Sequence, residues 1–134
     1  MKLPPLLRER SLAAQFVLAV VSPVVFGALC GYVLGSSEAG FNGLLLLAGI
    51  GGVLAGFEHL GARQGVVRGI VGGVLFTAAL VICFAVRGAP ALAHLPLPIA
   101  GMAVIYAVMG MPLGALGGWL RRRTEDRRAR ATAG

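Results

Sequence analysis

The sequence predicts an all-α membrane protein in which four transmembrane helices form an up-down bundle with both termini on the cytoplasmic side. Three observations indicate this fold class. The 134 residues are 57% hydrophobic and only 13% charged, whereas soluble domains carry about 25% charged residues. All charged residues except Glu38 and Arg87 lie in the two tails or in the segment 58–68. The apolar runs between these places are long enough to cross a bilayer, which takes about 20 helical residues.

We expect one transmembrane domain over residues 1–134, with a basic tail at 121–134. The expected spans are 12–34, 41–57, 69–86 and 97–120. The first apolar run is longer than the h-region of a signal peptide, which has about 7 to 15 residues, so we expect an uncleaved helix. The segments "GSSEAG" (35–40) and "RGAPALAHLP" (87–96) contain the polar, glycine and proline residues that typically connect helices.

The distribution of basic residues predicts the orientation. The chain has 12 Lys and Arg residues, from Lys2 to Arg130, and all but Arg87 lie in the tails or in the segment 58–68. Lys and Arg next to membrane spans stay on the cytoplasmic side. We therefore expect an integral protein of a bacterial cytoplasmic (inner) membrane, with both termini and the middle loop inside.

The segment "GFEHLGARQGVVRGIVGGV" (56–74) combines ionisable residues with glycines. At the bilayer centre each Arg or Glu would cost about 2.5 to 3.5 kcal/mol, and three of them about 7 to 10 kcal/mol, more than the flanking Leu and Val offset. We therefore place it at the cytoplasmic interface. The third helix is expected to begin near Gly61, with the side chains of Arg63 and Arg68 snorkelling to lipid phosphates.

Two interpretations of Glu58, His59, Arg63 and Arg68 stay open. In the first they form a solvated interfacial loop. In the second they form the cytoplasmic mouth of a transport path, or a headgroup site, in which Glu58 and His59 face the ligand. One histidine beside one carboxylate falls short of a metal ligand set, so no metal site is expected.

Glycine at four-residue spacing is the pattern that exceeds chance. The sequence contains 21 glycines, which form eight such pairs, whereas a random arrangement would give about three in the whole chain. The pairs join Gly27, Gly31 and Gly35; Gly52 and Gly56; Gly61, Gly65, Gly69 and Gly73; and Gly110, Gly114 and Gly118. Small residues at this spacing allow close helix packing in lipid. We expect part of the row 61–73 to lie between protomers.

Two prolines and two cysteines lie within the expected spans. Pro23 and Pro112 lack an N–H and are predicted to kink their helices, which leaves the carbonyls of Ala19 and Val108 without a donor. Cys30 and Cys83 are expected at similar depth, and buried thiols usually behave as small apolar residues. The sequence leaves open whether they pair.

The tail "RRRTEDRRARATAG" (121–134) follows the fourth span directly. Its basic residues include Arg121, Arg122, Arg123, Arg127 and Arg128. A cluster of this kind next to a membrane attracts anionic lipid headgroups by about 1 kcal/mol per residue. The tail lacks aromatic residues and a folded module, so we expect lipid rather than nucleic acid as its partner.

Three functional classes fit these features. The spans at their predicted boundaries contain no Asp, Glu, Lys, Arg or His, and no nucleophile–base pair or phosphate-binding loop is present, so we expect neither an enzyme nor a cofactor. The first class is an oligomeric channel or facilitator with a neutral, glycine-lined path. The second is a non-catalytic accessory or assembly subunit of a larger membrane complex. A holin-like lesion former is disfavoured because no helix has a polar face.

Overall fold

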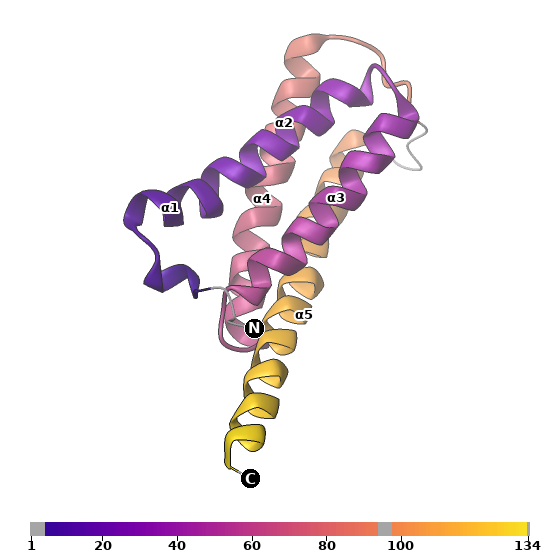
Figure 1. The fold of residues 1–134 in the computed structure, drawn as a ribbon. Coiled ribbons are helices and arrows are strands. Elements are labelled where there is room, and N and C mark those ends of the chain that lie inside the picture. The colour runs from indigo at the N-terminus through magenta and orange to yellow at the C-terminus, as the bar shows by residue number, and fades with distance from the viewer. Residues whose placement is uncertain (1–4, 94–97, 134) are drawn as a thin grey trace.

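The computed structural model describes residues 5–93 and 98–133. All regular structure in these residues is helical (Figure 1). The helices are η1 (Leu7–Glu9), α1 (Leu12–Phe16), η2 (Val17–Val21), α2 (Ser22–Leu34), α3 (Glu38–Phe57), α4 (Ala62–Arg87) and α5 (Ile99–Ala133). α1, η2 and α2 run on as one apolar segment. Four segments among the described residues are long and apolar enough to cross a membrane, which confirms the predicted fold class of a four-helix membrane bundle.

Three predicted boundaries move outward in the structure. α3 begins at Glu38 because the Oγ of Ser37 accepts a hydrogen bond from the amide of Gly40 at 3.1 Å. α4 begins at Ala62, directly after Gly61, whose φ of 97° favours glycine. α5 continues past 120 to Ala133, so the basic tail is part of the last helix. The predicted positions of Lys2, Pro96 and residue 97 lie outside the described residues.

α4 is the central helix of the bundle. It packs against α2 on one side and against α5 on another, and α3 packs mainly on α5. α2 and α3 follow each other in the chain but touch much less than these pairs. Figure 1 shows them close together at their connecting turn and diverging from there. This divergence opens one side of the bundle.

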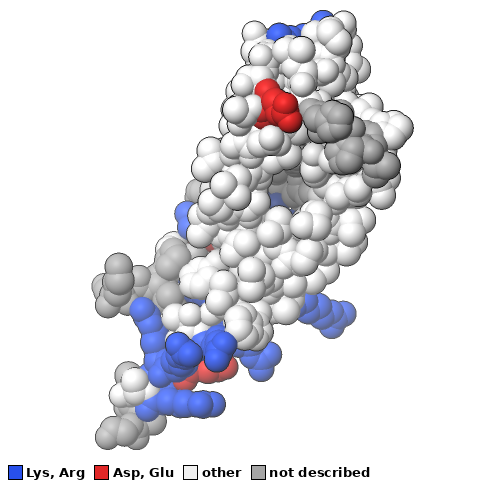
Figure 2. Space-filling view, turned by 90° about the vertical axis from the view of Figure 1, so that its right-hand side faces the viewer, with Lys and Arg blue, Asp and Glu red and all other residues white. Residues whose placement is uncertain are grey.

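The two ends of the bundle differ in charge. One end, which we call the basic end, carries residues 5–11, the α3–α4 loop 58–61 and the last part of α5. The other, which we call the far end, carries the α2–α3 turn 35–37 and residues 88–93. Figure 2 shows a broad uncharged band above a cluster of basic side chains at one end. Such a band is what a segment crossing a bilayer presents to lipid.

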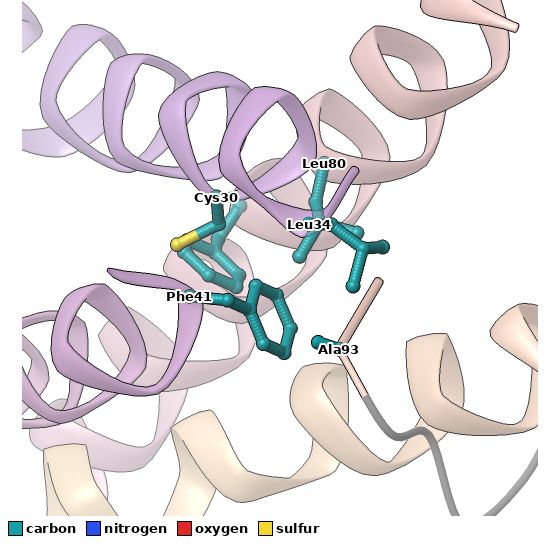
Figure 3. Packing of buried hydrophobic residues seen from close by; sticks show 6 residues of the cluster. Cys30, Leu34, Phe41, Leu80 and Ala93 are labelled. Carbon is teal, nitrogen blue, oxygen red and sulfur yellow. The ribbon is translucent and has the colours of Figure 1, made fainter. Parts of the chain in front are cut away.

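Buried apolar residues close the bundle toward the far end. Cys30, Leu34, Phe41, Leu80 and Ala93 are each at most 5% exposed and pack together (Figure 3). They come from α2, α3, α4 and the segment after α4. Both cysteine thiols are free in the structure.

The glycine row of residues 61–73 has three members within α4, namely Gly65, Gly69 and Gly73, and these three face α5. A Cβ at Gly73 would lie 2.6 Å from the carbonyl oxygen of Ala107. A Cβ at Gly65 or Gly69 would meet the carbonyl oxygen of Gly114 or Gly110 even more closely. The two helices therefore touch backbone to backbone along this row. The prediction that part of the row lies between protomers is wrong for these positions, because α5 of the same chain occupies their face.

The remaining glycine pairs also face neighbouring helices. Positions for Cβ atoms at Gly27 and Gly31 of α2 are taken by the backbone carbonyls of Phe76 and Leu80 in α4. In α3, Gly56 meets Gly114 of α5 in the same way. α4 thus presents one face to α5 and a different face to α2.

Candidate functional site

A groove with a volume of about 830 Å³ lies between α2 and α3. Residues 45–55 of α3 form one wall, residues between Leu18 and Phe26 form the other, and α4 and α5 form the floor. The volume falls in the range of about 300 to 1,000 Å³ that is usual for small-molecule sites.

The lining of this groove is largely apolar. Its polar side chains among the described residues are those of Ser22, Glu58, Arg68 and Tyr106. The ring of Tyr106 packs edge-on against Phe76, with ring centroids 6.4 Å apart. A mostly apolar site with a few polar groups is the usual arrangement for binding an organic ligand.

The side chain of Arg68 reaches from α4 to the first span. Its Nη2 donates to the carbonyl oxygen of Leu18 at 2.6 Å. In η2 the amide of Ser22 donates to Val17, five residues earlier, and the next position is Pro23, which has no N–H. The Leu18 carbonyl therefore lacks a donor in the π-helical register, and Arg68 supplies one.

This register corrects one sequence-based expectation. In a regular α-helix the donor missing at Pro23 would belong to the carbonyl of Ala19. The π turn shifts the hydrogen-bond ladder by one residue, so the missing donor belongs to Leu18. At Pro112, by contrast, α5 continues as one helix, and the predicted kink there stays a prediction.

Arg68 also corrects the predicted position of its own side chain. We expected it to snorkel to lipid phosphates, yet the residue is only 9% exposed and its head points inward. Because α4 begins at Ala62, Arg68 lies inside a candidate span, which the predicted boundary at residue 69 had excluded. The groove therefore contains a cation within a candidate span, where the predicted span boundaries left no charged residue.

Sequence spacing contains a signal for this inward position. Arg68, Gly72, Phe76 and Leu80 recur every four residues, so they share one face of α4. The last two contact the glycines of α2, and the same face leads down to Arg68. In the sequence Arg68 and Gly72 directly precede members of the glycine row, so the glycine pattern draws attention away from this stripe.

Glu58 connects the groove to the N-terminal segment. It lines the groove, and its Oε1 accepts a hydrogen bond from Nη2 of Arg10 at 2.8 Å. The carbonyl oxygen of Glu58 also accepts a bond from the amide of Leu7 at 3.1 Å. Residues 7–10 are thus attached to the α3–α4 loop by a backbone bond and an ion pair.

His59 faces a different, smaller cavity. This cavity has a volume of about 280 Å³ and is lined by residues of the N-terminal segment, by Glu58 and His59 of the α3–α4 loop, and by Gln64 at the start of α4. The Nδ1 of His59 lies 3.1 Å from the carbonyl oxygen of Ala55. Arg63 is exposed on the surface of α4. The four residues singled out from the sequence therefore do not form one cluster.

The arginines of the basic tail also differ from one another in exposure. Arg122, Arg123 and Arg127 are exposed at the end of α5. Arg121 is only 5% exposed, with its guanidinium 5.5 Å from the ring centroid of Phe57 and its Nε 2.7 Å from Oε1 of Glu125. The prediction that Arg121 binds lipid headgroups is therefore wrong, because its charge is turned toward the protein.

Among residues 5–93 and 98–133, no group of three or more His, Cys, Asp or Glu side chains is placed to hold a metal ion. Comparison with models of protein families, with curated proteins and with solved structures finds no match. The groove and its buried arginine are therefore interpreted from their own geometry.

Proposed function

We propose that this small polytopic membrane protein is a non-catalytic protein that binds an amphiphile, whose apolar part lies in the groove between α2 and α3. The observation that carries this proposal is an apolar groove of about 830 Å³ on the side of a transmembrane bundle. A groove in this position is reached from the lipid rather than from water. Its occupant is therefore a molecule that is itself dissolved in the bilayer.

The closed end of the bundle favours binding over a continuous channel. The buried cluster of Cys30, Leu34, Phe41, Leu80 and Ala93 fills the space between the helices toward the far end. The glycine row of α4 packs against the backbone of α5, at Gly65 and Gly69 most closely, and leaves no gap between these two helices there. A ligand that enters the groove is held there and leaves by the same side.

The positive-inside rule supports an orientation for this site. Basic residues at the basic end would place it in the cytoplasm, and Glu58 and Arg68 lie in the half of the groove nearer that end. In this proposal the groove exchanges its ligand with the cytoplasmic leaflet.

Filling the groove tests the proposal. Gly49 lines it, and a Cβ built there meets nothing within 4 Å among the described residues. Gly49→Phe should therefore occupy the groove without disturbing helix packing. The measurement is the motionally restricted fraction of a spin-labelled stearic acid methyl ester in phosphatidylcholine vesicles, read by electron paramagnetic resonance. We expect a restricted fraction with the wild-type protein and its loss in the variant.

Gly43→Phe is the matched control. It lies on the same helix, a Cβ there also meets nothing within 4 Å among the described residues, and it is not among the groove residues. Equal restriction by the wild type and both variants would contradict the proposal. Co-purification of a fixed partner protein together with no restriction of the probe would favour the accessory-subunit role instead.

A further inference from the structure

We propose that Arg68 binds the oxyanion head of an anionic lipid, such as a carboxylate or phosphate, while one chain of that lipid lies in the groove. This inference rests on the proposed function, because it needs an amphiphile in the groove. It adds the charge and the position of the headgroup.

The guanidinium of Arg68 is buried but not fully used. The residue is 9% exposed and lines the groove. Its Nη2 donates to Leu18, whereas its Nε is buried without a hydrogen-bond partner in the described part of the chain. A guanidinium has five N–H donors in a rigid fork that fits a carboxylate or phosphate. Leaving a buried donor unpaired is costly, and an oxyanion in the groove would satisfy it.

The local charge balance also calls for an anion. Glu58 is the acidic side chain that lines the groove in the described residues, and it is paired with Arg10 at 2.8 Å. Arg10 and Arg68 carry two positive charges against the one negative charge of Glu58. An unbalanced cation inside a membrane-spanning segment is expensive. A lipid with one negative charge at its head would neutralise the group.

The depth of Arg68 suits a headgroup followed by a chain. Arg68 lies six residues after the start of α4 at Ala62, which is about 9 Å along the helix axis. The groove continues from there along residues 45–55 of α3, a length of about 15 Å. Phe76 and Tyr106 lie beside this stretch. A headgroup on Arg68 thus leaves the apolar length of the groove for the chain.

Two probes of equal chain length separate head from chain. One is spin-labelled stearic acid at a pH at which it is ionised, and the other is its methyl ester. We expect the wild-type protein in phosphatidylcholine vesicles to bind the acid about tenfold more tightly than the ester, the ratio given by one charge-assisted hydrogen bond. A spin-labelled lysophosphatidate, compared with the ionised acid, then shows whether a phosphate head is preferred to a carboxylate, and the matching lysophosphatidylcholine is the zwitterionic control.

Arg68→Gln removes the charge but keeps a donor for the Leu18 carbonyl. We expect this variant to bind acid and ester equally, with its affinity for the ester unchanged. Arg68→Lys keeps the charge and should retain a preference for the acid. Arg63→Gln removes one positive charge from the exposed surface of the same helix, and it should leave the ratio as in the wild type. Helical content by circular dichroism checks that each variant is folded.

The outcomes separate the two proposals. If the wild type restricts both probes equally, and Gly49→Phe abolishes both, the groove binds chains but the anion site is wrong. If Arg68→Gln keeps the wild-type ratio, or Arg63→Gln abolishes it, the preference for the acid has another origin and the inference is overturned. If the wild type restricts neither probe, both proposals fall.

Discussion

The α4–α5 seam and the α2–α3 gap are the two most different interfaces of this bundle. In the seam, Gly65 and Gly69 touch the backbone of Gly114 and Gly110 so closely that no Cβ would fit. In the gap, a Cβ at Gly49 or Gly51 of α3 would meet nothing within 4 Å among the described residues. Both helices of each pair contain glycine, so glycine content alone does not close an interface.

The difference comes from which faces meet. In lipid there is no hydrophobic drive between helices, so an interface closes only where small residues on both helices face each other and the backbones gain dispersion contacts. α4 and α5 have such rows opposite one another. The glycines of α2, at Gly27 and Gly31, instead face α4. α3 is therefore held mainly by α5, and the space between α2 and α3 stays open.

The largest expected effect is on the closed seam. Gly69→Leu places a side chain where the Gly110 carbonyl lies, and backbone atoms move aside less easily than side chains. We expect the free energy of unfolding to fall by about 3 kcal/mol or more, measured by denaturant titration in mixed micelles. Gly43→Leu, at an open position of α3, is the control. Equal stability of the two variants would mean that the seam is not closely packed.

A smaller effect is expected where Arg68 crosses to the first span. Arg68→Ala leaves the Leu18 carbonyl without a donor, which should cost about 1 to 3 kcal/mol of unfolding free energy. Pro23→Ala restores an amide at the position that lacks one. Arg68→Ala should then cost about 1 kcal/mol less in the Pro23→Ala background than in the wild type. Additive losses in this double-mutant cycle would contradict the explanation of the π turn.

The smallest effect is expected at the ion pair between Glu58 and Arg10. Glu58→Gln removes the ion pair with Arg10 and leaves at most a neutral acceptor for its guanidinium; the side chains of Glu58 and Arg10 are 14% and 28% exposed. We expect a loss of about 1 kcal/mol or less, together with faster amide hydrogen exchange in residues 7–10. Arg122→Gln, at an exposed position of α5, should change neither quantity. Unchanged exchange in Glu58→Gln would show that the backbone bond to Leu7 alone holds the segment.

The sequence predicted the fold class well and the candidate site only in part. Hydropathy located the four spans, and the expected start of the third helix near Gly61 agrees with the start of α4 at Ala62. Glu58 and Arg68 were singled out and do line the groove. His59 and Arg63 were grouped with them by closeness in sequence, but His59 lines only the smaller cavity, which it shares with Glu58, and Arg63 is exposed on α4. Leu18 and Tyr106 could not be linked to the site, because their position depends on helices far away in the chain.

Hydropathy and the placement of charge by themselves determined that this chain forms apolar helices long enough to cross a bilayer, because burying a charge in lipid costs more than neighbouring residues offset. Which glycine row met which helix was decided only in the tertiary structure, since a small residue permits a close approach without selecting the partner. The same holds for Arg68. The sequence shows that a charge is present at this position. The inward direction of the side chain depends on the carbonyl of Leu18, 50 residues earlier, which Pro23 leaves without a donor.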